Sequence, residues 1–262
     1  MSIEVLILIF SFITLLLLNV PIAFCIGIPT TLVLVIGTGF TPAISTVSQQ
    51  IATAFDSFTL LAIPFFILSG NIMATGGIAK RLIDFAKTIV GGLPGGLALV
   101  NIVSAMLFGA VSGSAIASAA AIGSFMHPRM IKDGYDPSYS AAVNVTSATT
   151  GLIIPPSNVL IVYSLASGGV SIGALFLAGY LPGILLGISL MIVASILAYK
   201  QGFRSTPSVP IIEIVKRFFD ALLGLTLIII IIGGIIFGIF TATEAASIAV
   251  VYAFVLTIFI YK

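Results

Sequence analysis

The chain has 262 residues, of which 60% are hydrophobic and 7% are charged, and its formal net charge is +2. Soluble domains carry about 25% charged residues, so this composition excludes a soluble globular domain. It predicts an all-α integral membrane protein, a polytopic helix bundle in a lipid bilayer. No feature of the sequence is typical of a nucleic-acid-binding protein, so we expect no nucleic-acid partner.

The apolar start of the chain differs from a cleaved signal peptide. It lacks a basic n-region, carries Glu4 and has no small-residue cleavage site before the next apolar run. We therefore expect a retained transmembrane helix at 3–19. The single cysteine, Cys25, excludes an intrachain disulfide and a thiolate metal cluster, and we expect it to be a small core residue.

Eight apolar segments follow one another along the chain, and a spanning helix needs about 20 apolar residues. The candidates are 3–19, 20–39, 56–77, 91–127, 138–166, 172–199, 218–240 and 244–261. The segment 91–127 is too long for one crossing, and 138–166 is interrupted. The other six are predicted to be single helices.

The cations predict how these segments cross the membrane. If the N-terminus is external and 91–127 enters and leaves on one side, all ten Lys and Arg residues fall on one face, which the positive-inside rule makes cytoplasmic. The opposite loops, around 40–50, 167–173 and 240–244, contain no Lys or Arg. The cations are Lys80, Arg81, Lys87, Arg129, Lys132, Lys200, Arg204, Lys216, Arg217 and Lys262.

The centre of 91–127 is a run of small and polar residues, AVSGSAIASAAAIGS. A helix from Ala115 to Arg129 is about 22 Å long at 1.5 Å per residue, which is less than the hydrocarbon thickness of about 30 Å. We therefore expect a re-entrant hairpin whose tip, Ser112-Gly113-Ser114, stops near mid-membrane. Small residues at such a place are also typical of a helix-packing face that holds no ligand.

Residues 138–166, SYSAAVNVTSATTGLIIPPSNVLIVYSLA, predict a helix broken in its middle. Pro155 and Pro156 cannot donate backbone hydrogen bonds, and the residue before a proline is disfavoured in a helix. Gly151 is a natural helix terminator, while Ser157 and Asn158 open a second half-helix. The alternative is a proline kink in a structural helix. Polar residues precede the break: Asn144, Thr146, Ser147, Thr149 and Thr150.

A hairpin tip and a broken helix at the same depth together favour a secondary transporter. Unwound carbonyls and half-helix C-termini coordinate a small cation, and half-helix N-termini offer N–H groups to an anionic substrate. The neutral oxygens of Ser, Thr and Asn suit Na⁺. Neither motif contains a carboxylate that would serve a proton relay or hold a divalent ion tightly.

Four stretches resemble the large membrane subunit of tripartite ATP-independent periplasmic (TRAP) transporters. The resemblance implies the first inverted repeat of an elevator-type, sodium-coupled importer of small carboxylates, of the C4-dicarboxylate or sialic-acid type. It also implies a periplasmic substrate-binding protein and a small four-helix membrane subunit as partners, in the bacterial inner membrane with a periplasmic N-terminus. The stretches are FGAVSGSAIASAAAIGSFMHPRMIKDGYDPSYSAAVNVTSATTGLIIPPSN, LAIPFFILSGNIMATGGIAKRLIDFA, GYLPGILLG and GIFTATEAASIAVVYA.

The resemblance also implies a site between the hairpin and the broken helix. The sodium ligands carried over are Ser112, Gly113, Ser114, Thr150, Gly151, Pro155 and Pro156. The substrate-binding residues are Ser114, Thr150, Ser157 and Asn158. Na⁺ is the expected coupling ion, and no catalytic residue is expected because the protein is not predicted to be an enzyme.

The same resemblance implies how the chain is divided. The expected parts are scaffold helices and an arm (1–90), the hairpin (91–127), the broken helix (128–170), a connecting helix with a cytoplasmic loop (171–217) and an incomplete second repeat (218–262). The segment at 20–37 can be laid against 241–258 as a weak internal repeat. We therefore expect a truncated product that does not transport alone.

Other functions fit the sequence less well. An intramembrane hydrolase needs a base beside its serine, and the only histidine, His127, is predicted at the membrane edge. A passive channel or scaffold does not need two midplane breaks. A divalent-anion/sodium symporter, which works without a binding protein, is the alternative within transporters. Glu244 is expected in the first turn of the last helix, with Thr243 as the cap.

Overall fold

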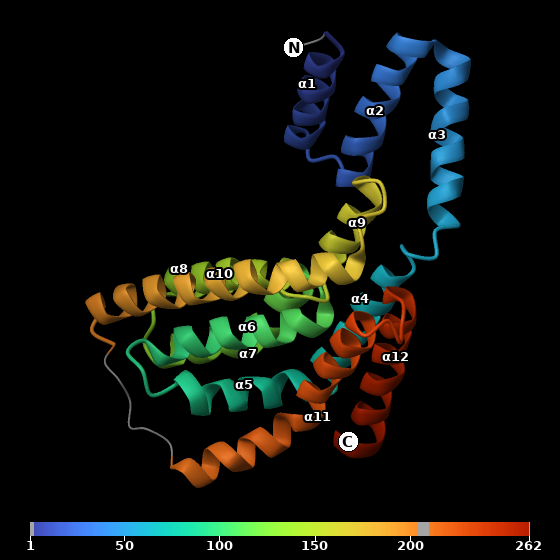
Figure 1. Cartoon of the computed structure of the whole chain (residues 1–262). Helices are drawn as coiled ribbons and strands as arrows, with labels where there is room; N and C mark the ends of the chain where they lie inside the picture. The colour runs from blue at the N-terminus through green and yellow to red at the C-terminus, as the bar shows by residue number, and fades with distance from the viewer. Residues whose placement is uncertain (1–2, 204–209, 262) are drawn as a thin grey trace. The chain divides into compact units, whose positions relative to one another are not determined.

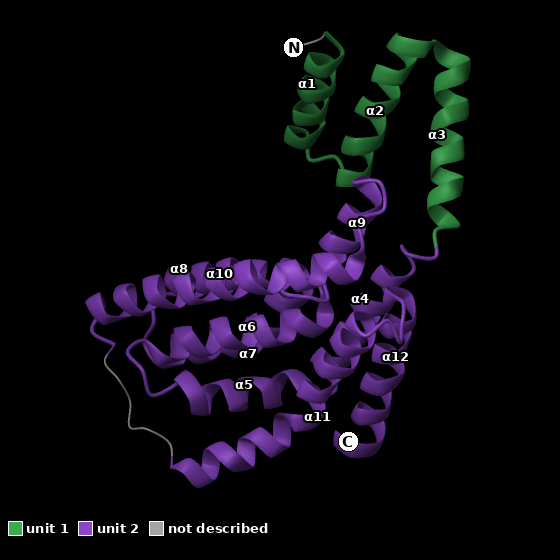
Figure 2. Cartoon of the chain, in the orientation of Figure 1, with its two compact units in different colours: residues 1–57 green, residues 58–262 purple. Residues whose placement is uncertain are grey.

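The computed structural model describes residues 3–203 and 210–261, which form helices and connecting turns and no strand (Figure 1). The chain divides into two compact units, Met1–Ser57 and Phe58–Lys262 (Figure 2). The all-helical class predicted from composition is confirmed. Arg204 and Lys262, two of the ten predicted cytoplasmic cations, lie outside the described residues.

The first unit consists of α1 (Ile3–Leu17), α2 (Ile22–Thr38) and α3 (Phe40–Phe55). α1 and α2 have 15 and 17 residues, so they are about 23 and 26 Å long, somewhat shorter than a full crossing. Cys25 is fully buried, as expected. The predicted loop at 40–50 is wrong, because Gly39 (φ 90°) turns the chain from α2 directly into α3.

The second unit holds the predicted hairpin and broken helix. Figure 1 shows α5, α6, α7, α8 and α10 running side by side, and the neighbouring helices pack on one another. The elements are α4 (Ala62–Thr75), α5 (Ile78–Val90), α6 (Gly96–Ser112), α7 (Ala115–Lys132), α8 (Pro137–Ala148), the 3₁₀ turn η1 (Thr149–Leu152), α9 (Asn158–Ala166), α10 (Ile172–Lys200), α11 (Ile211–Ile236), α12 (Ala242–Val255) and the π-helical turn η2 (Leu256–Tyr261).

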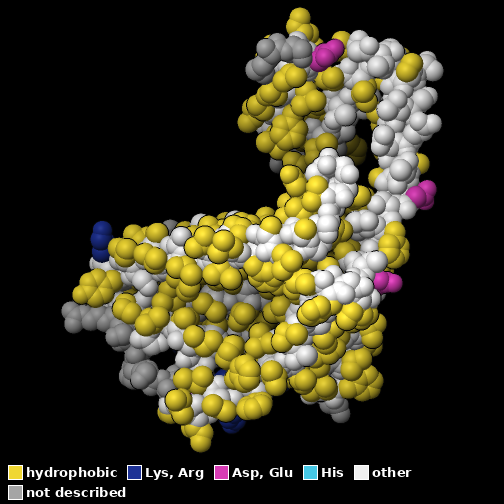
Figure 3. All heavy atoms as spheres, viewed as in Figure 1, with side chains coloured by type: hydrophobic (Ala, Val, Ile, Leu, Met, Phe, Trp, Pro, Cys, Tyr) yellow, Lys and Arg dark blue, Asp and Glu magenta, His cyan; other side chains and the backbone are white. Residues whose placement is uncertain are grey.

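Three of the described helices are long and apolar enough to cross a membrane: α10, α11 and the continuous helix formed by α12 and η2. α4 and α5 meet this criterion only as a pair, which is bent by 71°. The predicted single span at 56–77 is therefore wrong: α4 has 14 residues, and Gly77 (φ 75°) redirects the chain into α5. Hydrophobic side chains cover most of the face in Figure 3, as a lipid-facing surface requires.

The return helix of the hairpin is longer than the predicted stretch from Ala115 to Arg129. α7 continues through Pro128 to Lys132 and has 18 residues, about 27 Å. It ends in a Schellman motif in which Gly134 (φ 91°) follows the last turn and the Tyr135 N–H donates to the Met130 carbonyl at 3.0 Å. Even so, the helix is shorter than the hydrocarbon thickness of about 30 Å.

The turn after α7 meets the end of α10. The rings of Tyr135 and Phe203 stack with centroids 3.8 Å apart, and the Tyr139 hydroxyl donates to the Ala194 carbonyl at 2.8 Å. These contacts bring together the helix ends that carry Arg129, Lys132 and Lys200. A separate pocket joins the start of α10 to the end of α11 and the start of α12, where the helix-connecting residues carry no Lys or Arg.

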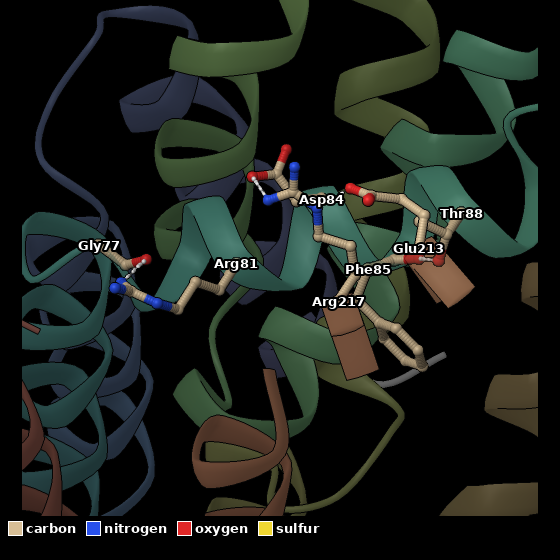
Figure 4. A network of polar contacts seen from close by, with 7 residues as sticks. All are labelled: Gly77, Arg81, Asp84, Phe85, Thr88, Glu213 and Arg217. Carbon is tan, nitrogen blue, oxygen red and sulfur yellow. Dashed lines mark hydrogen bonds and ion pairs between the residues drawn. The ribbon is translucent and has the colours of Figure 1, made fainter. Parts of the chain in front are cut away.

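Charged side chains join α5 to α11 (Figure 4), and Arg81 of α5 also contacts the last described residue, Tyr261. Arg217 of α11 lies 3.5 Å from the Asp84 carboxylate of α5 and 2.9 Å from that of Glu213. Arg81 donates to the Gly77 carbonyl at 3.3 Å and lies over the Tyr261 ring, 3.7 Å from its centroid. These contacts fix α5 against α11 and against Tyr261.

Candidate functional site

The hairpin tip has the three residues predicted for it. α6 ends at Ser112, and Gly113 adopts a left-handed conformation (φ 62°, ψ 15°), which glycine reaches without a steric penalty. Ser114 is the N-cap of α7, and its hydroxyl accepts the Ala117 N–H at 3.3 Å. Ser112 is fully buried, with its hydroxyl 3.5 Å from the Ser114 carbonyl oxygen. The predicted turn between two packed helices is confirmed.

The predicted helix break is confirmed as well. Regular helix ends at Ala148, η1 follows, and α9 begins at Asn158 after the cis-linked prolines. Ser157 is the N-cap of α9: its hydroxyl accepts the Leu160 N–H at 3.3 Å and donates to the Leu152 carbonyl. Two half-helices therefore flank an irregular stretch, so a simple proline kink in a continuous helix is excluded.

Gly151 has a different role from the predicted helix terminator. It is not among the residues with a positive φ and lies within η1. A Cβ atom at Gly109 of α6 would lie 2.4 Å from the Gly151 Cα atom, and one at Gly151 would lie 3.0 Å from the Gly109 Cα atom. The two glycines let the backbones of α6 and η1 touch, which sets the spacing of the hairpin and the break.

The tip and the break are in direct contact. The Asn158 N–H, at the start of α9, donates to the Gly113 carbonyl oxygen at 3.2 Å. A Cβ atom at Gly113 would lie 2.9 Å from the Pro156 carbonyl oxygen and 3.4 Å from Asn158 Oδ1. Two segments about 40 residues apart in sequence thus meet at Gly113, where oxygen atoms of the break lie close to the tip.

The contact between the tip and the break is neutral and rich in acceptors. Asn158 Oδ1 is buried and has no hydrogen-bond partner among the described residues. It lies near the Pro156 carbonyl oxygen, since both would be within 3.4 Å of a Cβ atom at Gly113. No titratable side chain belongs to the tip or the break, and the described residues contain no cluster of His, Cys, Asp and Glu able to hold a metal. An unpaired neutral oxygen such as Asn158 Oδ1 can bind a monovalent cation or a water molecule.

Not every predicted site residue takes part in this contact. The Thr150 hydroxyl donates to the Ser147 carbonyl at 2.7 Å, and the Thr150 carbonyl accepts the N–H groups of Ile153 and Ile154. The ring of Pro155 lies toward α10, where a Cβ atom at Gly179 would be 3.4 Å from its Cγ atom. Thr150 and Pro155 therefore stabilise the break through contacts with α8, η1 and α10 and not with the tip.

Two glycines of the site were not predicted from the sequence motifs. Gly109 contacts Gly151 as described above, and a Cβ atom at Gly70 of α4 would lie 2.7 Å from Ser112 Cβ. A signal for Gly109 is present in the sequence, because it precedes Gly113 by four residues and small residues at that spacing let helices approach closely. Gly70 lies too far away in the chain for any local pattern to connect it to the tip.

The predicted cap of the last helix is wrong by two residues. Thr241, not Thr243, is the N-cap of α12. It forms a capping box with Glu244: the Glu244 N–H donates to Thr241 Oγ1 at 3.3 Å, and the Thr241 N–H donates to Glu244 Oε2 at 2.8 Å. Thr243 instead donates to the Phe58 carbonyl at 2.6 Å. Glu244 lies in the first turn, as predicted.

The geometry does not favour hydrolytic chemistry. His127 Nδ1 lies 2.9 Å from the hydroxyl oxygen of Ser140, which belongs to α8 and not to the SGS tip. A serine at the tip therefore has no base beside it among the described residues. An apolar helical chain with a hairpin tip against a broken helix is instead the construction of a secondary transporter.

Comparison with known proteins defines the family. The chain belongs to the tripartite ATP-independent periplasmic transporter family, DctM component, which matches residues 9–262. This confirms the resemblance seen in the motifs, and with it a multi-pass membrane transporter component that is not an enzyme. The family match sets aside the divalent-anion/sodium symporter class.

Three relatives illustrate the match. The chain is 54% identical over 246 residues to the uncharacterized protein YgiK of Salmonella typhimurium, covering 94% of this chain and 57% of that protein. It is 44% identical over 245 residues to the C4-dicarboxylate TRAP transporter large permease protein DctM of Vibrio cholerae (93% and 53%). It is 39% identical over 254 residues to the sialic acid TRAP transporter large permease protein SiaM of Vibrio cholerae (97% and 59%). The chain thus spans a little over half the length of these relatives.

Proposed function

We propose that this chain is part of the large permease of a sodium-coupled TRAP importer of small carboxylates. The observation that carries the proposal is the direct contact between the hairpin tip and the broken helix, with the unpaired Asn158 Oδ1 beside it. Relatives named for C4-dicarboxylates and sialic acid support the substrate class.

The coupling ion in this proposal is Na⁺ held at the tip. Asn158 Oδ1 and the carbonyl oxygens of Gly113 and Pro156 are neutral ligands of the type found at unwound helices in transporters. Ser112, Ser114 and Gly151 lie next to these ligands, whereas Thr150 and Pro155 stabilise the break without facing the ion. An ion at this place would bind the hairpin and the broken helix together, because it would take ligands from both.

The carboxylate substrate is proposed to meet the N-terminal ends of α7 and α9. These ends begin next to Ser114 and Ser157, where the helix dipole favours an anion. The predicted substrate residues Ser114, Thr150, Ser157 and Asn158 lie at or just behind these ends. The proposal includes a periplasmic binding protein and a small four-helix subunit as partners, and the inner membrane with a periplasmic N-terminus as the location.

Sodium-dependent stability tests the ion site in the detergent-solubilised chain. A ligand that binds only the folded state at 100 times its Kd adds about 2.7 kcal/mol to the free energy of unfolding. We expect NaCl to raise the melting temperature above that in choline chloride at the same ionic strength. Asn158→Ala should lose this increase.

The matched control is Asn71→Ala, which makes the same chemical change at an exposed position of α4. It should keep the full sodium response. An equal sodium-induced rise in the wild type and in Asn158→Ala would contradict the proposed tip site.

A further inference from the structure

A continuous groove runs along one side of α12, away from the hairpin tip and the break. Its first part is a pocket of about 520 Å³ between α12 and the start of α4, two helices that pack on each other (Figure 1). Its second part is a pocket of about 400 Å³ on α12 itself. Ser247 and Ile248 line both pockets, so the two form one groove.

The groove carries a charge at one end only. Glu244, in the first turn of α12, lines the first pocket, whereas Val251 and Val255 line the second. The hydroxyls along the groove are already engaged: Thr243 donates to the Phe58 carbonyl, Ser247 to the Thr243 carbonyl and Tyr252 to the Leu223 carbonyl. The Glu244 carboxylate is therefore the polar group at this groove that a ligand can use.

Glu244 keeps one carboxylate oxygen for such a ligand. Its Oε2 atom accepts both donors of Thr241 at 2.8 Å, while Oε1 accepts no hydrogen bond from the described residues. The ion pairs among those residues belong to Arg217 and not to Glu244. A carboxylate at the edge of a membrane-spanning helix attracts a cationic partner, so the charge at this end of the groove is complementary to an ammonium group.

The length of the groove matches one leaflet of a bilayer. α12 and η2 together form a helix long and apolar enough to cross a membrane. Val255 follows Glu244 by 11 residues, about 17 Å along the helix, and half of the hydrocarbon thickness is about 15 Å. The groove is open on the outside, because Phe58, Val251 and Val255 are 56%, 63% and 41% exposed. An acyl chain can therefore enter it sideways from the membrane.

We propose that this groove binds a phospholipid with a primary ammonium headgroup, phosphatidylethanolamine. The ammonium donates a charge-assisted hydrogen bond to Glu244 Oε1, and one acyl chain lies along Ile248 and Val251. A primary ammonium has three N–H donors, whereas the quaternary ammonium of phosphatidylcholine has none, so the carboxylate distinguishes the two lipids. The inference rests on this groove and not on the ion proposed at Gly113.

Fluorescence quenching tests the inference, because the chain contains no tryptophan. Val251→Trp places a single indole at the groove of the full chain, reconstituted in phosphatidylcholine vesicles. A minor fraction of phosphatidylethanolamine brominated on its acyl chains should quench this fluorescence at least twice as strongly as the same fraction of brominated phosphatidylcholine. Adding Glu244→Gln should abolish the difference. Glutamine also serves in a capping box, so the start of α12 should stay folded.

Two controls accompany this measurement. Phe254→Trp reports on an exposed position of α12 that lines neither pocket, and both brominated lipids should quench it equally. Glu213→Gln removes a carboxylate from α11 and should leave the preference seen by Val251→Trp unchanged.

Three results would overturn the inference. The first is equal quenching of Val251→Trp by the two lipids, and the second is a preference that survives Glu244→Gln. The third is quenching of Phe254→Trp alone, which would show that protein, such as a second copy of the chain, covers the groove. The sodium-induced rise in melting temperature should persist in Glu244→Gln, so each of these results leaves the proposed ion site at Gly113 standing.

Discussion

At the scale of single residues, glycines determine how closely the hairpin approaches the broken helix. Gly109 and Gly151 bring two backbones into contact, and Gly113 both turns the chain and leaves room beside the Pro156 carbonyl. At these positions, glycine leaves room for neighbouring backbone that a side chain would occupy. Their substitution should therefore have effects that helix propensity alone does not predict.

Gly109→Ala should destabilise the protein, because its Cβ atom would lie 2.4 Å from the Gly151 Cα atom and backbone cannot move aside cheaply. Overpacking of this kind reduces the free energy of unfolding by about 1–3 kcal/mol. Thermal unfolding in detergent measures the loss. The control is Gly233→Ala in α11, where a Cβ atom meets nothing within 4 Å, and alanine should be neutral or stabilising by up to about 1 kcal/mol. Equal losses would show that the contact with Gly151 is not the cause.

Gly113→Ala should weaken sodium binding at least tenfold. Its Cβ atom would lie 2.9 Å from the Pro156 carbonyl oxygen, inside the proposed ion site. Gly134→Ala is the control: it also places alanine at a positive φ, with strain of about 1–2 kcal/mol, but its Cβ atom meets nothing within 4 Å. Sodium titrations of the melting temperature should therefore shift for Gly113→Ala only. A similar shift in both variants would attribute the effect to general strain.

At the scale of elements, the bent pair of α4 and α5 is held against α11 and η2. Arg217 links α5 to α11 through Asp84, and Arg81 lies over the Tyr261 ring of η2. The rings of Phe85 and Phe218 add a tilted contact with centroids 5.7 Å apart. The ion pair is partly exposed, so packing rather than charge should dominate the stability of this joint.

Asp84→Asn should consequently lower the free energy of unfolding by less than about 1 kcal/mol, because the side chains of Arg217 and Asp84 are 38% and 28% exposed. The loss should shrink at high ionic strength, set with choline chloride so that sodium sites stay unaffected. In an Arg217→Gln background the same substitution should have no further effect. A loss that is independent of salt and of Arg217 would assign another role to Asp84.

At the scale of the whole molecule, hydropathy and helix-breaking residues predicted the architecture well. They did not predict how individual side chains are oriented. The strongly apolar α10 was located to within one residue, and the tip and the break followed from Gly113 and the prolines. α3 was missed because its mixed sequence, FTPAISTVSQQIATAF, has no long apolar run. Thr150 was assigned to the site although its hydroxyl donates to the Ser147 carbonyl at the end of α8. Which face of a helix a hydroxyl occupies depends on packing with distant segments, which no local pattern contains.

Charge placement gives the whole chain a testable orientation. Lys132 and Lys200 lie at helix ends that meet through Tyr135 and Phe203, whereas the connection around Ser167 carries no Lys or Arg. The positive-inside rule then places Lys132 in the cytoplasm and Ser167 in the periplasm. In a Cys25→Ser background, an impermeant maleimide should label Ser167→Cys in intact cells and Lys132→Cys only after permeabilisation. Both target residues are exposed, so access to the reagent depends on the side of the membrane. Labelling of both variants in intact cells would refute this orientation, and the background without cysteine should remain unlabelled throughout.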